Sequence, residues 1–169
     1  MYIVVGLGNP GEEYSHTRHN TGRLATEFMS EKVSGIKILT PDTFMNKTGS
    51  AVVKVVGNPS TSLRARKAAE KLIVIYDDLD LPLGTLRISY NRSSGGHKGL
   101  ESIIRALKTK EFIRIRIGID KKEDVEDHIL GEFRKPELET LKKVFKRASE
   151  AVQMIVEEGR EKAMNKFNS

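Results

Sequence analysis

The sequence predicts an α/β fold in which a twisted mixed β-sheet is flanked by helices, with residues 1–169 forming a single domain. Short apolar runs typical of buried strands occur at 2–7, 36–39 and 72–76. Segments with apolar residues at helical spacing separate these runs, and this alternation is the pattern of a layered α/β domain. A chain of 169 residues is also the size of one ordinary domain with one sizeable core.

In the first half of the chain, a loop follows strand 2–7, and a helix begins at Thr21 and extends to about 34–35. Strand 36–39 comes next, and residues 48–57 form a short helix that Gly57 closes. A turn and a basic stretch that can be helical lead to strand 72–76.

In the second half, residues 85–90 alternate like a strand that is exposed on one face, and residues 112–119 place three isoleucines on one side and Arg114 and Arg116 on the other. These two alternating segments favour some antiparallel pairing, so the sheet is predicted to be mixed. A helix follows residue 99. Pro136 lies just inside the start of the clearest helix and Gly159 follows its end, and a short basic helix spans 160–167.

The composition excludes several classes of protein. Cysteine is absent, which excludes disulfides, thiol nucleophiles and thiolate metal sites. The longest apolar runs are about half of the roughly 20 residues that a bilayer span needs. The N-terminus has neither the basic start nor the cleavage site of a signal peptide, so we expect a cytoplasmic protein without a membrane partner.

The formal net charge is +6, and the excess lies in the middle of the chain. Residues 64–116 contain twelve Lys and Arg against six Asp and Glu, whereas the two flanking segments are nearly balanced. This region is either a solvated face or a patch for a polyanion such as nucleic acid, and the charge alone does not decide between them.

Polar loops follow the predicted strands at 8–20, 41–46, 77–80 and 91–99, and ligands of such folds bind at the carboxyl ends of strands. The segment "GLGNPG" has the glycine spacing of a dinucleotide-binding loop. Pro10 and the residues after it do not begin an apolar-periodic helix, and the acids Glu12 and Glu13 would repel a pyrophosphate. A tight loop that presents Asn9 is therefore favoured over a nucleotide site.

A histidine and a carboxylate are the most promising catalytic residues. His16 and His19 have no acidic or cysteine partner at a usual metal-ligand spacing, so no metal site is expected, and no G-x-S-x-G elbow is present. In "DDLD", Asp78 is expected to point away from Asp77. Asp77 can fix the tautomer of His19, whose other ring nitrogen can then take a proton from water. Alternatively, His19 is a surface residue or a helix cap.

Two further loops have both structural and functional interpretations. In "TFMNKTG", Phe44 and Met45 either fill the core while Asn46 caps a helix, or they form an apolar wall beside which Asn46 binds a polar substrate. In "GGHKG", at 95–99, the glycines allow close approach of the backbone, and His97 and Lys98 lie near a helix N-terminus, which attracts anions.

Together these segments resemble the bacterial-type peptidyl-tRNA hydrolase family. The resemblance runs in order through "VGLGNPGEEYSHTRHNTG", "TPDTFMNKTGSAV", "DDLDLPLG", "SSGGHKGLESI" and "FIRIRIGI", and it covers nearly the whole chain. It implies a monomer that cleaves the ester between a peptide and the 3′ ribose of tRNA, without a metal or an organic cofactor. The partner would be peptidyl-tRNA, bound through its acceptor stem and 3′ end, and the basic excess would meet the acceptor-stem backbone.

The resemblance also implies roles for single residues. His19 would be the general base, Asp77 would hold it, and Asn9 would contact the acylated end of the substrate. Asn46 would bind substrate beside the wall formed by Phe44 and Met45. The remaining expected substrate contacts are Tyr14 at the tRNA 3′ end, His97 and Lys98 in the glycine-rich loop, and Arg116 at the 5′ phosphate, with Arg87, Arg92 and Arg114 as helpers.

Two departures from the family pattern bear on these expectations. The connection "SEKVSG" before strand 36–39 is shorter than is usual in the family, and Lys98 stands where the family usually has Asn. A lysine adds a charge near the catalytic histidine and cannot accept a hydrogen bond. The rival interpretation is a non-catalytic RNA-binding relative. Lys98 favours it, whereas the presence of Asn9, His19, Asn46 and Asp77 argues against it. A third interpretation is a generic α/β hydrolase of small esters.

Overall fold

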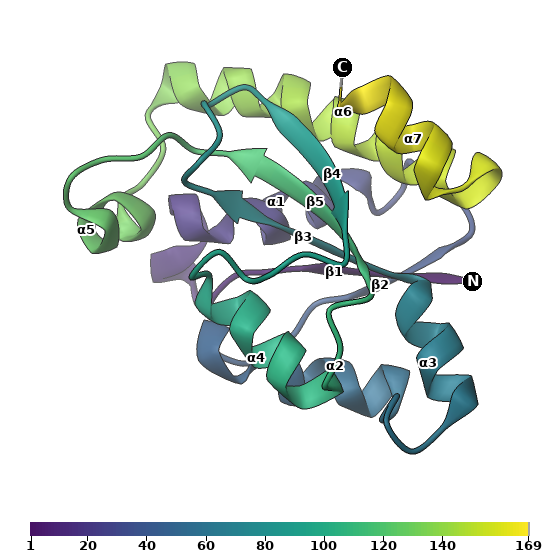
Figure 1. Ribbon diagram of the computed structural model, residues 1–169. Helices are drawn as coiled ribbons and strands as arrows, with labels where there is room; N and C mark the ends of the chain where they lie inside the picture. The colour runs from purple at the N-terminus through teal and green to yellow at the C-terminus, as the bar shows by residue number, and fades with distance from the viewer. Residues whose placement is uncertain (169) are drawn as a thin grey trace.

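The computed structural model describes residues 1–168, which form one five-stranded sheet with helices on both faces (Figure 1). The strands are β1 (Tyr2–Gly6), β2 (Ile36–Leu39), β3 (Leu72–Asp78), β4 (Leu86–Tyr90) and β5 (Ile113–Gly118). Their order in the sheet is β2-β1-β3-β5-β4, and only the β4–β5 pair is antiparallel. The predicted mixed α/β architecture is therefore confirmed.

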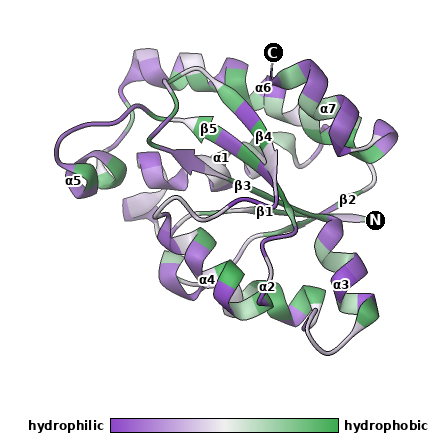
Figure 2. Cartoon of the chain, in the orientation of Figure 1, coloured by the Kyte–Doolittle hydropathy of each residue, from purple (hydrophilic) through white to green (hydrophobic). Residues whose placement is uncertain are grey.

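The helices are α1 (Thr21–Met29), α2 (Thr48–Val56), α3 (Leu63–Glu70), α4 (Lys98–Leu107), α5 (Val125–Leu130), α6 (Lys135–Glu158) and α7 (Arg160–Phe167). One sequence expectation needs correction, and one helix was not predicted. The helix from Thr21 ends at Met29 rather than near residue 34, because residues 30–32 form a turn, residues 34–35 a bend, and Gly35 has a positive φ of 78°. Helix α5 was not predicted, and the segment that leads into it is hydrophilic, as Figure 2 shows.

Two hydrophobic cores lie on opposite faces of the sheet, because successive side chains of a strand point to opposite sides. On one face, Ile73 and Ile75 pack with α1, α6 and α7. On the other, Val74 and Tyr76 pack with α2 and α4. The end of β3 continues this alternation, so Asp77 and Asp78 point to opposite faces.

Two glycines bring α1 into close contact with the sheet. A Cβ on Gly22 would lie 2.0 Å from the carbonyl oxygen of Ile75, and one on Gly6 would lie 2.3 Å from that of Gly22. The start of α1 is therefore pressed against the ends of β1 and β3, and this packing sets the position of the turn that precedes it. Within residues 1–168, no helix combines the length and apolar character needed to cross a bilayer.

Candidate active site

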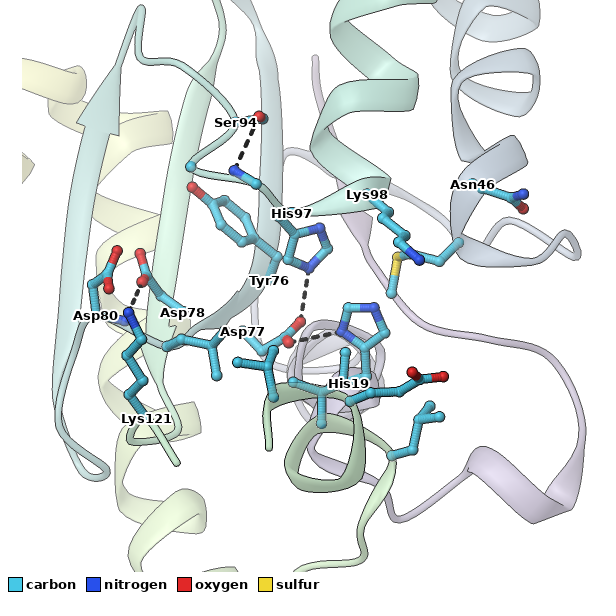
Figure 3. Close-up of a pocket in the computed structure, with 18 of the residues that line it drawn as sticks. His19, Asn46, Tyr76, Asp77, Asp78, Asp80, Ser94, His97, Lys98 and Lys121 are labelled. Atoms are coloured by element: carbon cyan, nitrogen blue, oxygen red, sulfur yellow. Dashed lines mark hydrogen bonds and ion pairs between the residues drawn. The ribbon is translucent and has the colours of Figure 1, made fainter. Parts of the chain in front are cut away.

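A cavity of about 720 Å³ opens at the carboxyl ends of β1 and β3 (Figure 3). It collects Arg92 from the expected helpers, together with eight of the expected catalytic and substrate-binding residues: Asn9, His19, Phe44, Met45, Asn46, Asp77, His97 and Lys98. Its apolar lining also includes residues that the sequence did not single out, namely Tyr76, Leu79, Val125, Ile129 and Leu130. The cavity thus combines buried polar groups with an apolar wall, as ligand-binding sites commonly do.

His19 lies in a 3₁₀ turn, Arg18–Asn20, directly before α1. Arg18 fixes this turn from outside, because its guanidinium donates to the carbonyl of His128 at 3.2 Å and to Glu137 at 3.1 Å. The ring of His19 is buried and its Nδ1 lies 2.8 Å from Oδ2 of Asp77. Nε2 has no hydrogen-bond partner among residues 1–168 and belongs to the wall of the cavity.

Asp77 contacts two histidines at once. Its Oδ2 bonds His19, and its Oδ1 lies 2.9 Å from Nε2 of His97 (Figure 3). The ligand-type atoms of these three residues all lie within 4.8 Å of one another, so the cluster has the composition of a metal site. The two nitrogens nearest the carboxylate are engaged with it, however, and a cation between them would have to replace both hydrogen bonds.

The charges of the pair favour a protonatable histidine beside an ionised carboxylate. Burial lowers the pKa of His19, and the charge of Lys98 lowers it further. The charge of Asp77 and its hydrogen bond raise this pKa by more, so the net result lies above the ordinary 6.5. Burial likewise raises the pKa of Asp77, yet the two histidines hold it well below its usual range. Asp77 therefore stays ionised and stabilises a proton on His19.

The orientation of the Asn9 amide is fixed by the backbone around it. The Met45 amide N–H donates to Oδ1 of Asn9 at 2.8 Å, which leaves the Nδ2 group of Asn9 as the donor side of the amide. The backbone of Asn9 is in turn clamped by Asn20, whose Oδ1 accepts from the Asn9 N–H and whose Nδ2 donates to the Asn9 carbonyl, both at 2.9 Å. Asn20 is a positioning residue that the sequence did not single out, although it stands in the quoted segment "VGLGNPGEEYSHTRHNTG".

His97 differs from the expected substrate contact. Its Nδ1 accepts from the backbone N–H of Gly99 at 3.1 Å, and its Nε2 is bonded to Asp77, so neither ring nitrogen is left for a substrate. Lys98 is exposed, and Figure 3 shows its side chain extending from the start of α4 toward His19.

Three predicted contacts lie at the rim. Phe44 is 53% exposed, and the Tyr14 ring meets its ring edge-on at a centroid distance of 6.1 Å. Tyr14 itself is not among the cavity residues. Asn46 is exposed and lines both the cavity and an adjacent hollow of about 340 Å³ that Lys47 and Arg105 also line.

The arginines of β5 lie elsewhere than the sequence led us to expect. The Arg116 side chain is 7% exposed, its Nε donates to Oδ2 of Asp78 at 2.7 Å and its Nη1 to Oγ of Ser89 at 3.2 Å, so its guanidinium is held within the protein rather than presented to a 5′ phosphate in this structure. Arg114 is fully buried and donates to the carbonyls of Ser93 and Lys110, so it cannot be a helper on the surface. Both residues fill the interior because β5 is an inner strand of the sheet.

The basic excess of residues 64–116 is also divided in space. Helix α3, with Arg64, Arg66 and Lys67, precedes β3 and lies at the end of the sheet remote from the cavity (Figure 1). The cations that line the cavity are Arg92, Lys98 and Lys121. The part of the charge that can meet an anion near His19 is therefore smaller than the sequence total.

A family model described as peptidyl-tRNA hydrolase matches residues 3–37 and 27–169 of this chain. The two matched ranges overlap at 27–37. This overlap contains the connection between α1 and β2, which is shorter than is usual in the family. The peptidyl-tRNA hydrolase of Thermodesulfovibrio yellowstonii is 40% identical over 189 residues, covering 99% of this chain and 99% of the relative. That of Fervidobacterium nodosum is 42% identical over 185 residues, covering 99% and 96%.

Solved structures give the same result for the fold. The crystal structure of peptidyl-tRNA hydrolase from Acinetobacter baumannii superimposes with a TM-score of 0.86 at 28% identity, covering 100% of this chain and 95% of that one. The similarity therefore extends over the whole sheet and its helices.

Proposed function

This chain belongs to the peptidyl-tRNA hydrolase family, and on that premise we propose that it hydrolyses the ester between the peptide and the 3′ ribose of peptidyl-tRNA. The observation that carries the proposal is the buried pair of His19 and Asp77, 2.8 Å apart, with Nε2 of His19 facing the cavity. A histidine held in this way is suited to general-base catalysis near neutral pH.

The reaction begins when Nε2 of His19 takes a proton from a water molecule as that water attacks the ester carbonyl. Asp77 holds Nδ1–H and stabilises the imidazolium that forms. The oxyanion of the tetrahedral intermediate needs a fixed donor, and Nδ2 of Asn9 is directed by the Met45 N–H to serve as one. Collapse of the intermediate breaks the bond to the ribose 3′ oxygen, which takes the proton from His19. The products are the free peptide acid and tRNA with a 3′ hydroxyl.

Charge and shape around the cavity support an RNA substrate. Phosphate contacts give affinity without sequence information, which suits an enzyme that acts on many tRNAs. Arg92 and Lys98 line the cavity, and Lys47 and Arg105 line the hollow next to Asn46, where the 3′ strand can continue. The apolar residues of the cavity, including Leu79 and Ile129, offer contacts to the peptide. We propose that the protein acts as a cytoplasmic monomer and needs no cofactor in this mechanism.

The deciding experiment offers the protein three substrates: N-blocked aminoacyl-tRNA, unblocked aminoacyl-tRNA and a small ester. We expect turnover of the first only, and we expect the His19→Ala variant to lose it. Since phosphate contacts release counterions, KM for the tRNA substrate should rise steeply with salt.

Two other outcomes would contradict the proposal. Tight RNA binding without turnover would identify a non-catalytic RNA-binding relative, and equal turnover of the small ester would identify a general esterase. A KM that does not change with salt would remove the role proposed for the cations.

A further inference from the structure

His97 caps helix α4 with its ring. The backbone N–H groups of Gly99 and Leu100 point at Nδ1, at 3.1 and 3.4 Å. A backbone N–H can only donate, so Nδ1 must accept and has no proton of its own. The remaining ring proton therefore lies on Nε2, which donates to Oδ1 of Asp77 at 2.9 Å. The side chain is 8% exposed, so water has little access to either bond.

The two histidines on Asp77 are therefore not equivalent. A second proton on His97 would have to enter at Nδ1, where it would break the cap and meet the positive end of the α4 dipole. A second proton on His19 enters at Nε2, which faces the cavity and breaks no bond. A second proton on His97 would therefore cost hydrogen bonds of the helix cap, whereas a second proton on His19 would cost none.

The loop that carries His97 is anchored from beneath the site. Arg114 donates to the Ser93 carbonyl at 3.1 Å, and the His97 N–H donates to the Ser94 carbonyl at 3.1 Å. Gly95 and Gly96, with φ of 61° and 87°, make the turn that brings the ring over Asp77. The buried arginine that the sequence assigned to RNA is thus part of the support of this loop.

We propose that His97 is a positioning residue: a neutral donor on Nε2 that holds the carboxylate of Asp77 and, by sharing its charge, sets how readily His19 takes a proton. The proposal rests on the proposed function in that His19 is the base. With one donor on each oxygen, the carboxylate cannot turn away from His19. Removal of the His97 donor would leave more negative charge for His19, and the protonated ring would then be favoured.

The other charges near the pair are accounted for. Asp78 also lines the cavity, but its carboxylate is bonded to Arg116, and Lys98 approaches His19 rather than Asp77. The remaining charged residues that line the wider cavity are Asp80, Arg92, Lys121 and Glu126. The variants below leave all of these unchanged.

Two substitutions separate the two roles of the ring. His97→Asn keeps a side-chain acceptor for the start of α4, since Asn is a preferred cap, but it is too short to reach Asp77. His97→Gln is long enough to donate to Asp77 but is a poor cap. The titration of each histidine in the full-length protein would be followed by NMR, with the buried His128, whose Nε2 bonds the Ile119 carbonyl, as the internal control.

In His97→Asn we expect the pKa of His19 to rise by roughly half a unit to one unit, because a hydrogen bond to a charged group is lost. The acid limb of kcat/KM should move to higher pH by the same amount. In His97→Gln both should stay near the wild-type values, and His128 should not change in either variant. Ring nitrogen shifts in the wild type should show Nδ1 of His97 without a proton.

An unchanged or lowered pKa of His19 in His97→Asn would overturn the proposal, as would a proton on Nδ1 of His97 in the wild type. The wild-type measurement decides even if a variant does not fold. Absence of hydrolase activity would contradict the proposed function. The NMR titration of His19 would still show whether His97 sets its pKa.

Discussion

Asp77 and Asp78 are neighbours at the end of β3, and both are paired carboxylates, yet their surroundings differ. Both line the cavity, but the Asp77 carboxylate contacts two imidazoles, whereas the Asp78 carboxylate contacts the guanidinium of Arg116. Imidazole gains and loses a proton near neutral pH, and guanidinium does not. The comparison shows that the partner decides whether a buried carboxylate takes part in proton transfer or holds the structure together.

The largest effect expected from this comparison is the contrast between Asp77→Asn and Asp78→Asn. An amide at position 77 would present an N–H to Nδ1 of His19, which would then carry its proton on Nε2 and could not act as a base. We expect kcat to fall by about 10³- to 10⁴-fold in Asp77→Asn. In Asp78→Asn we expect less than a tenfold loss, because the Asp78 carboxylate bonds Arg116 and the Asp80 N–H rather than a reacting group. Steady-state kinetics on N-blocked aminoacyl-tRNA measures both.

Equal losses of kcat in these two variants would mean that the opposite faces of β3 are coupled, and the comparison would fail. Circular dichroism of both variants would establish that each one is folded.

The Arg116→Gln variant is expected to lose stability rather than chemistry. Removing one partner of a nearly buried pair leaves the Asp78 carboxylate uncompensated, which costs about 3 kcal/mol of unfolding free energy. Arg87 is a matched control, since it lies opposite Arg116 in the register of β4 and β5 and its side chain is exposed. Denaturant unfolding should show less than about 0.5 kcal/mol for Arg87→Gln.

The same variant tests whether Arg116 contacts tRNA. Because its guanidinium is held by Asp78, Arg116→Gln should leave the slope of log affinity against log salt unchanged, whereas Arg92→Gln should reduce it by about one. A reduced slope in Arg116→Gln would show that Arg116 reaches a phosphate after all.

The pH dependence should separate activity from stability at the Asp77 pair. A general base must be neutral, so kcat/KM should fall about tenfold per pH unit below the pKa of His19, which lies above 6.5.

The stability of the fold should depend on pH in the opposite direction. The raised pKa of His19 contributes stability fully below about 6.5, and this contribution is lost as pH rises through the folded-state pKa. The lowered pKa of Asp77 contributes stability above about 3.8, which is lost in acid. The pH profile of kcat/KM tests the activity, and denaturant unfolding at a series of pH values tests the stability. An acid limb of kcat/KM with an apparent pKa below 6.5 would contradict the assignment of His19 as the base.

The smallest effect is expected from Lys98→Asn. Its exposed ammonium faces His19 and lowers the pKa of that ring, so the variant should raise this pKa. We expect kcat to stay within tenfold of the wild type, about 1.4 kcal/mol in the barrier. Lys121→Asn is the control, since Lys121 also lines the cavity and should leave the pKa of His19 unchanged. A change of kcat beyond tenfold would assign Lys98 a direct part in the reaction.

Local patterns were sufficient for much of the fold. Apolar runs identified β1, β2 and β3, and Pro136 and Gly159 bracketed α6, because burial on one or two faces imposes a periodicity on neighbouring residues. Alternation along β3 also predicted that Asp77 and Asp78 point apart. Helix α5 was missed because its few apolar residues make a contact with the cavity rather than a continuous stripe.

The site was predictable in its members but not in its bonds. The sequence by itself determined that a histidine, an aspartate and two asparagines follow the strands of an α/β sheet, since loops at strand ends meet at one edge. The tertiary structure alone decided that Arg114 and Arg116 are interior, because alternating arginines on an inner strand look the same in sequence as those on an exposed one. It also decided that both nitrogens of His97 are used within the protein, because a hydrogen bond between residues 20 positions apart leaves no periodic trace in the chain.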